Sequence, residues 1–126
     1  MLKLDATLFI VLFVSMAYDW IVQTNWEATN KFTNWKARYV HSLIYATLST
    51  LTLTLFGYSE MTLIWTYLAL LISHFFIDDR KLVVWLMVNV KRIPREDIPG
   101  LWWMNIGIDQ WLHIIVIFII SVVVNI

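Results

Sequence analysis

Four long apolar segments limit what this chain can fold into. A bilayer core is about 30 Å thick and takes about 20 helical residues to cross. Segments close to that length cover residues 4–25, 39–56, 61–79 and 104–124. We therefore predict an all-α polytopic membrane protein in which each of the four segments is a transmembrane helix.

The overall composition agrees with a lipid environment. Hydrophobic residues make up 60% of the 126 residues and charged residues only 14%, whereas soluble domains carry about a quarter charged residues. Three glycines and two prolines leave little room for linkers, so residues 1–126 are predicted to form a single transmembrane domain. A formal net charge of zero gives no reason to expect a nucleic-acid partner. The lack of cysteine excludes disulfides and thiolate metal ligands.

Between the third and fourth segments lies a shorter apolar stretch, residues 81–90. Ten residues are too few to cross a bilayer, and the stretch has basic residues at both ends, so we predict a short helix in the membrane interface. Pro94, Pro99 and Gly100 then interrupt the chain before the last segment.

The basic residues predict the orientation. Three of the nine lie in residues 26–38 and five in residues 80–103, whereas Lys3 is alone near the N-terminus. Cytoplasmic connections retain lysine and arginine, so we predict that both termini face outward from the cytoplasmic (inner) membrane. Seven tryptophans suit an aromatic belt at the cytoplasmic interface, namely Trp20, Trp26, Trp35, Trp85, Trp102, Trp103 and Trp111.

The first segment also has features of a signal peptide, because Lys3 precedes an apolar run. However, it has no convincing small-residue cleavage site and continues into Asp19 and Gln23. These features favour a transmembrane helix.

Ionisable side chains in a transmembrane helix are costly and are by default functional candidates. Asp19 and Gln23 are four residues apart, and His74–Asp78 and Asp109–His113 repeat that spacing, which places each pair on one helix face. His41 lies in the first turn of the second segment. Every one of these groups lies toward the predicted cytoplasmic end, so we expect one polar layer that contains all three histidines.

Imidazole and carboxylate groups suit zinc, manganese or iron(II), and helical pairs four residues apart commonly present two ligands. The predicted metal ligands are His41, His74, Asp78, Asp109 and His113. Asp19 and Gln23 are the catalytic candidates, which could activate water, orient a ligand or bind a second metal. Lys31 and Lys81 are the candidates for binding the anionic head group of a substrate.

Two other interpretations of the polar layer remain open. Hydrogen bonds between helices could simply hold the bundle together, at about 0.6 kcal/mol each. Buried carboxylates could instead form a path for protons or ions. Burying this many ionisable groups in a membrane costs free energy, which disfavours a purely structural role for them.

At these residues the chain resembles a family of small bacterial and phage membrane proteins that is classed only as a domain of unknown function. The resemblance rests on Asp19-Trp-Ile-Val-Gln23, Lys31, His41, Ser73-His74-Phe75-Phe76-Ile77-Asp78-Asp79-Arg80-Lys81 and Asp109-Gln110-Trp111-Leu112-His113. The chain is also distantly similar to inner-membrane proteins described as metal-dependent hydrolases. These resemblances imply a shared polar site and supply no reaction.

Two functions from different classes follow as hypotheses. The first is a membrane-embedded, metal-dependent hydrolase that acts on a lipid or lipid-linked substrate from the cytoplasmic leaflet. The second is a non-enzymatic oligomeric membrane protein, such as a channel, a pore or an interaction partner. Membrane lipids are the expected partners in both, and the second hypothesis adds further copies of the chain.

Overall fold

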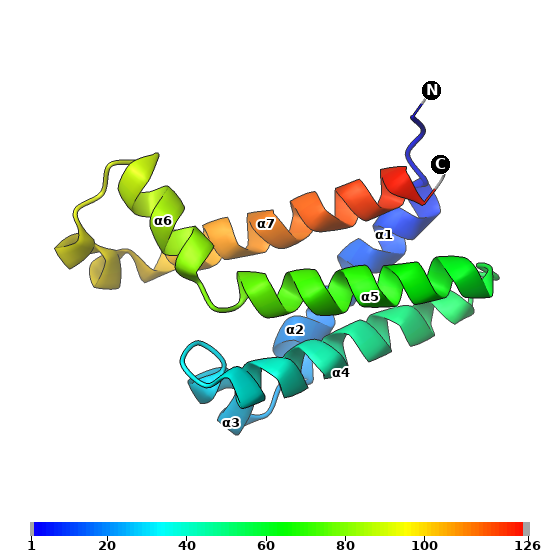
Figure 1. The fold of residues 1–126 in the computed structure, drawn as a ribbon, viewed down its shortest axis with the longest axis horizontal. Helices are drawn as coiled ribbons and strands as arrows, with labels where there is room; N and C mark the ends of the chain where they lie inside the picture. Colours follow the sequence, from blue (N-terminus) through cyan, green and yellow to red (C-terminus); the bar gives the residue numbers. More distant parts are fainter. Residues whose placement is uncertain (1, 125–126) are drawn as a thin grey trace.

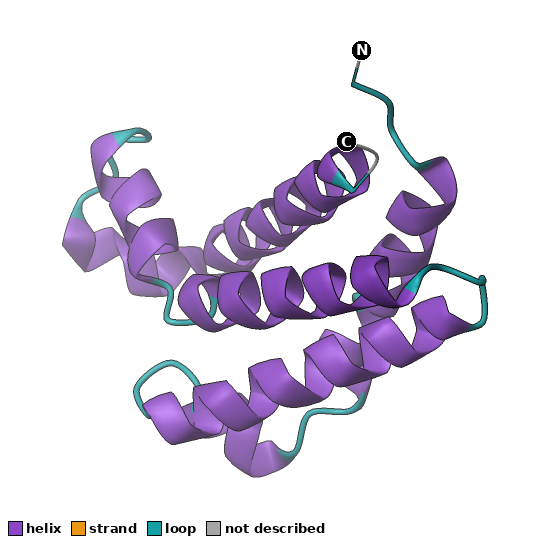
Figure 2. Cartoon of the chain, turned by 45° about the vertical axis from the view of Figure 1, so that its right-hand side comes forward, coloured by secondary structure: helices purple, strands orange, loops and turns teal. Residues whose placement is uncertain are grey.

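The computed structural model describes residues 2–124, which contain helices and connections but no strand (Figures 1 and 2). The predicted all-α class is confirmed. In chain order the helices are α1 Ala6–Ser15, α2 Ala17–Ile21, α3 Asn25–Asn30, α4 Trp35–Thr54, α5 Glu60–Ile77, α6 Lys81–Asn89, the 3-10 helix η1 Arg95–Leu101, and α7 Trp102–Val123.

The long helices run between the same two ends of the molecule (Figure 1). Helix α4 packs on α5, α5 packs on α7, and α1 packs on both α4 and α7. The backbone N–H of Asp5 donates to the carbonyl of Ser121 at 2.9 Å, so the two ends of the described chain lie together. Helices α3 and α6 and the 3-10 helix η1 gather at the opposite end (Figure 1).

The prediction of four long spans is only partly confirmed. Among residues 2–124, two helical stretches are long and apolar enough to be candidate membrane spans: Glu60–Ile77, and the continuous run Arg95–Val123 formed by η1 and α7. Helix α4 has 20 residues and is long enough to cross a membrane. Its first turns carry basic residues and its second half carries hydroxyl groups, so its mean hydropathy is below that of a candidate span. The first predicted span is instead divided into α1 and α2.

That division falls at Met16. The Ser15 hydroxyl donates to the Val11 carbonyl at 2.8 Å, and the Met16 backbone N–H bonds to Phe13 at 3.2 Å instead of continuing the α-helical pattern. The interruption is limited to Met16, which itself has helical dihedral angles. In α2 the Asp19 side chain is buried.

Polar side chains are common among the buried residues, and large apolar side chains are common among the exposed ones. An apolar core forms around Leu12, Tyr45, Leu70 and Ile117, but the buried set also contains as many polar as apolar side chains. Large apolar side chains cover the outside, as with Leu55, which is 82% exposed, and all eight tryptophans are exposed.

Candidate metal centre

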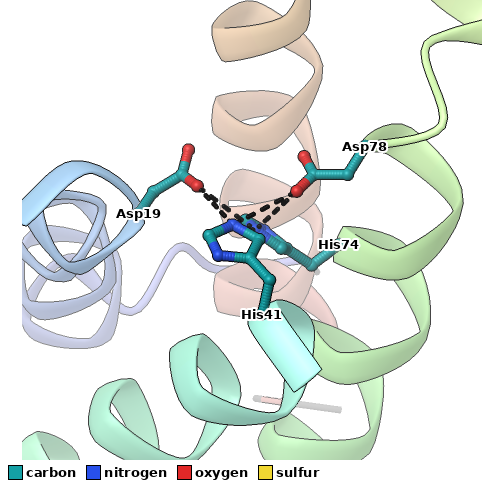
Figure 3. Close-up of side chains that lie close together, drawn as sticks. All are labelled: Asp19, His41, His74 and Asp78. Carbon is teal, nitrogen blue, oxygen red and sulfur yellow. Dashed lines mark hydrogen bonds and ion pairs between the residues drawn. The ribbon is translucent and has the colours of Figure 1, made fainter. Parts of the chain in front are cut away.

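Four buried side chains from three helices converge on one point (Figure 3). Asp19 comes from α2, His41 from α4, and His74 with Asp78 from α5 and its C-cap. His41 Nε2 lies 2.8 Å from Asp19 Oδ1 and 3.2 Å from Asp78 Oδ2. His74 Nε2 lies 3.4 Å and 3.3 Å from the same two oxygens and 3.1 Å from His41 Nε2. Each side chain therefore offers one donor atom to a shared centre.

A second group joins the first through Asp78. Asp78 Oδ1 lies 3.5 Å from His113 Nε2 of α7, and Asp109 lies one turn before His113. One ligand atom from each of Asp78, Asp109 and His113 lies within 4.8 Å of the others. All five predicted metal ligands are therefore buried in one connected cluster.

Helical spacing explains how the pairs reach this cluster. The backbone N–H of Asp78 bonds to the His74 carbonyl at 3.0 Å, so Asp78 lies one turn beyond His74 on the same face even though α5 ends at Ile77. On α7 the same spacing aligns Asp109 with His113. The sequence placed these residues in one layer, and the structure brings them together in one cluster.

Contacts on the far side of the ring orient two of the imidazoles, a hydrogen bond in His113 and a nearby carboxylate in His41. His113 Nδ1 lies 2.8 Å from the Asp109 backbone carbonyl, and because a carbonyl oxygen only accepts, Nδ1 is the donor and Nε2 is the nitrogen that faces the cluster. His41 Nδ1 lies 3.6 Å from Glu27 Oε1. A carboxylate on the far side of a histidine ring is the usual companion of a metal-binding nitrogen.

Glu27 is a site residue that our sequence analysis missed. It is 1% exposed and forms a capping box with Thr24 at the start of α3. The Thr24 hydroxyl and backbone N–H both donate to Glu27 Oε2, at 2.6 and 2.8 Å. The Thr-x-x-Glu pattern predicts this box, but the proximity of Oε1 to His41 depends on the tertiary packing.

The two candidate lysines lie in different surroundings. Lys31 is buried inside the cluster, with Nζ 3.2 Å from His41 Nε2, 3.3 Å from Asp78 Oδ2 and 3.5 Å from Asp19 Oδ1. The Lys81 side chain is 87% exposed and lies near Asp79, at 3.9 Å. The structure therefore brings Lys31 to the cluster but leaves Lys81 on the surface.

A cavity of about 280 Å³ adjoins the cluster. Gln110 Nε2 donates to Asp19 Oδ2 at 3.2 Å and to Asp109 Oδ2 at 3.3 Å, so its amide lies between the two carboxylates that line the cavity. The lining residues are Asp19, Trp20, Gln23, Ala28, Lys31, Phe32, Arg80, Ile106, Asp109 and Gln110. Gln23 thus shares a cavity with Asp19, as expected for two catalytic candidates on neighbouring turns.

Arg80 is a second residue whose position the sequence did not indicate. Its backbone is in the left-handed region, at φ 60°, which is uncommon for a residue other than glycine. Nη1 donates to Asn105 Oδ1 at 2.7 Å, and the guanidinium lies 4.2 Å from the centre of the Phe32 ring. These contacts hold a permanent positive charge in the cavity wall.

Residues 7–126 match the family described as a protein of unknown function, DUF3307. The chain belongs to this family. No curated protein and no solved structure matched the chain. The resemblance to a family of unknown function is therefore confirmed, whereas the similarity to metal-dependent hydrolases is not shown.

The donor set of this DUF3307 chain fits a divalent metal ion. Asp109 Oδ1 and His113 Nε2 are buried and have no hydrogen-bond partner, and Asp78 Oδ2 is shared among Lys31 and two imidazoles. Lys31 is one ammonium among three buried aspartates. Buried charges require compensation, and imidazole with carboxylate suits zinc, manganese or iron. These buried groups could therefore hold a metal ion.

Proposed function

We propose that this chain is a multi-pass protein of the cytoplasmic (inner) membrane that hydrolyses a lipid or lipid-linked substrate with a divalent metal ion. The observation that carries the proposal is the buried convergence of imidazole nitrogens and carboxylate oxygens from α2, α4 and α5 (Figure 3). Helices normally avoid burying this many ionisable groups unless the groups serve a function.

The surface supports a membrane location. Exposed aliphatic and aromatic side chains cover helices on every side, whereas the buried set is rich in polar groups. Water disfavours large exposed apolar patches, and lipid does not. We propose four passes, formed by α1 with α2, α4, α5 and α7, because all four run between the same two ends (Figure 1). Helix α4, with 20 residues, would cover about 30 Å at 1.5 Å per residue.

The proposed chemistry uses a water molecule at the metal. A bound divalent ion would supply hydroxide near neutral pH by acidifying its water ligand. Asp19 lies between the ligands and the cavity, because Oδ1 contacts His41 and Oδ2 accepts from Gln110. Asp19 can therefore face the centre with one oxygen and accept a proton with the other. Gln23 lines the same cavity and would orient the water.

The cavity suits an anionic head group attached to an apolar tail. Lys31 and Arg80 supply positive charge, and Trp20, Phe32 and Ile106 supply apolar surface. An arginine held by an amide and an aromatic ring is well placed to bind phosphate or carboxylate oxygens.

The first test is the metal content of protein purified in detergent without a chelator or a histidine tag. By inductively coupled plasma mass spectrometry we expect at least one zinc, manganese or iron per chain. His74→Ala should bind less metal than the wild type, because it removes a ligand from the centre, while Asp97→Asn on the exposed 3-10 helix should bind as much as the wild type. Metal-dependent release of a head group from membrane lipids, absent in Asp19→Asn, would then support hydrolysis.

Absence of metal in the wild-type protein, even after incubation with Zn²⁺ or Mn²⁺, would overturn the proposal. Lys31 would then be the resident cation, since it already contacts Asp19, Asp78 and His41. The oligomeric, non-enzymatic alternative would next be tested by ion flux in liposomes.

A further inference from the structure

We infer that the centre holds two metal ions bridged by the carboxylate of Asp78, and that its substrate is a phosphoester. This inference rests on the proposed function and gives it a stoichiometry and a substrate class. It starts from the two groups of candidate ligands, Asp19–His41–His74–Asp78 and Asp78–Asp109–His113, which share Asp78.

The two oxygens of Asp78 serve different groups. Oδ2 lies 3.2 Å from His41 Nε2 and 3.3 Å from His74 Nε2, whereas Oδ1 lies 3.5 Å from His113 Nε2. Asp78 is 1% exposed, so neither oxygen is satisfied by bulk solvent. A carboxylate that offers one oxygen to each of two ligand sets is suited to bridge ions about 3.5–4 Å apart, the separation found in two-metal hydrolytic sites.

The second ligand set, Asp78–Asp109–His113, has features of a cation site of its own. Asp109 and His113 are 4% and 5% exposed, and Asp109 Oδ1 and His113 Nε2 have no hydrogen-bond partner. The bond from His113 Nδ1 to the Asp109 carbonyl directs Nε2 toward Asp78. A buried carboxylate oxygen without a hydrogen-bond partner is costly, and a cation held by Asp78, Asp109 and His113, which offer ligand atoms within 4.8 Å of one another, would compensate it.

The ammonium of Lys31 directly balances negative charge only in the first ligand set, Asp19–His41–His74–Asp78. Its ammonium contacts Asp19, His41 and the Oδ2 side of Asp78. On the other side, Asp109 Oδ2 receives a neutral amide donor from Gln110. A second divalent ion would supply positive charge where the lysine does not reach.

A bridged pair of ions beside a cationic cavity wall favours phosphoester hydrolysis, because two ions can stabilise both the attacking and the leaving oxygen of an in-line displacement. The water oxygen forms a bond to phosphorus, and the bond from phosphorus to the ester oxygen breaks. Asp19 takes one water proton, which then passes to the leaving alcohol. The products are the phosphate and the free alcohol, with no oxidant or co-reactant. Arg80 and Lys31 in the cavity wall match the phosphate charge.

The experiment is equilibrium dialysis of metal-stripped protein in detergent against Mn²⁺, followed by metal analysis and electron paramagnetic resonance. We expect two Mn²⁺ per chain and an exchange-coupled spectrum. His113→Ala should bind one Mn²⁺ with an uncoupled six-line spectrum, and so should His41→Ala. Asp78→Asn should weaken binding at both positions by tenfold or more. Far-UV circular dichroism and elution volume identify misfolded variants, and His113→Gln is the substitute if His113→Ala misfolds.

The outcomes separate the two proposals. One Mn²⁺ per wild-type chain, unchanged in His113→Ala, would overturn the two-metal inference and leave the metal-dependent hydrolase standing. Two Mn²⁺ without exchange coupling would overturn the bridge. No bound Mn²⁺ or Zn²⁺ in any variant would overturn both.

Discussion

At the scale of single residues, Lys31 determines how the buried charges are balanced. Its ammonium lies within 3.5 Å of Asp19 and Asp78 oxygens, so it stabilises these carboxylates whenever no other cation is present. Removing one partner of a buried ion pair costs about 3–5 kcal/mol, because the remaining charge is left uncompensated. A metal ion at the same carboxylates would take over part of that compensation.

We therefore predict that Lys31→Met destabilises the metal-free protein by about 3–5 kcal/mol and that added Zn²⁺ or Mn²⁺ restores most of the loss. Thermal unfolding followed by tryptophan fluorescence in detergent measures both effects. Lys81→Met is the control, because the Lys81 side chain is 87% exposed. An equal gain from metal in Lys31→Met and in the wild type would contradict the shared role of lysine and metal.

At the scale of elements, the short helix α3 brings two charged residues into the centre. Glu27 and Lys31 are one turn apart, at the start of α3 and at its C-cap. A helix of six residues has little stability of its own. Its position therefore depends on the Thr24–Glu27 capping box and on the buried contacts of Lys31. The same carboxylate that caps α3 also faces His41.

We predict that Glu27→Gln lowers metal affinity by about 10–100-fold, as expected when the partner of a ligating histidine is changed. The number of ions bound at saturation should not change, because no ligand is removed. Competition with a fluorescent chelator measures the affinity. Thr24→Ala is the matched control, since it weakens the cap but keeps the charged carboxylate of Glu27. Equal affinity in Glu27→Gln and the wild type would mean that Glu27 only caps α3.

At the scale of the whole molecule, the fold has a polar interior, an apolar exterior and two ends that differ in charge. The two ends of the described chain lie together at one end of the molecule, and the helices α3 and α6 with most of the basic residues lie at the other (Figure 1). The centre is connected to the basic end through α3 and through the turn after α5. If the basic end is cytoplasmic, a substrate would reach the cavity from the inner leaflet.

The absence of cysteine allows a clean test of this orientation. Glu60→Cys and Asp97→Cys replace exposed acidic residues at opposite ends of the molecule. We predict that a membrane-impermeant maleimide labels Glu60→Cys in intact cells and labels Asp97→Cys only after permeabilisation. The reverse pattern would show that the orientation predicted from the basic residues is wrong. Recovery of both variants in the soluble fraction would exclude the membrane location.

Much of the architecture follows from local patterns. Residues 61–79, 81–90 and 104–124 were predicted as helices, and α5, α6 and α7 begin and end within a few residues of those bounds. The division between α1 and α2 at Met16 was not predicted, because residues 4–25 contain no glycine or proline to indicate it. The 18-residue α5 and the η1–α7 run satisfy the hydropathy of a span. Helix α4 mixes polar and apolar residues. Counting apolar segments therefore predicted four helices with the hydropathy of a span, whereas two of the described helical stretches have it.

By itself, the sequence determined the helical class and the pairing of His74 with Asp78 and of Asp109 with His113, because spacing of four residues aligns side chains on any helix. Only the tertiary structure decided how each helix is rotated about its axis. That rotation placed Lys31 inside the cluster, left Lys81 exposed and brought Glu27 to His41. These contacts join residues distant in the chain, and they depend on packing and charge compensation that no local pattern records.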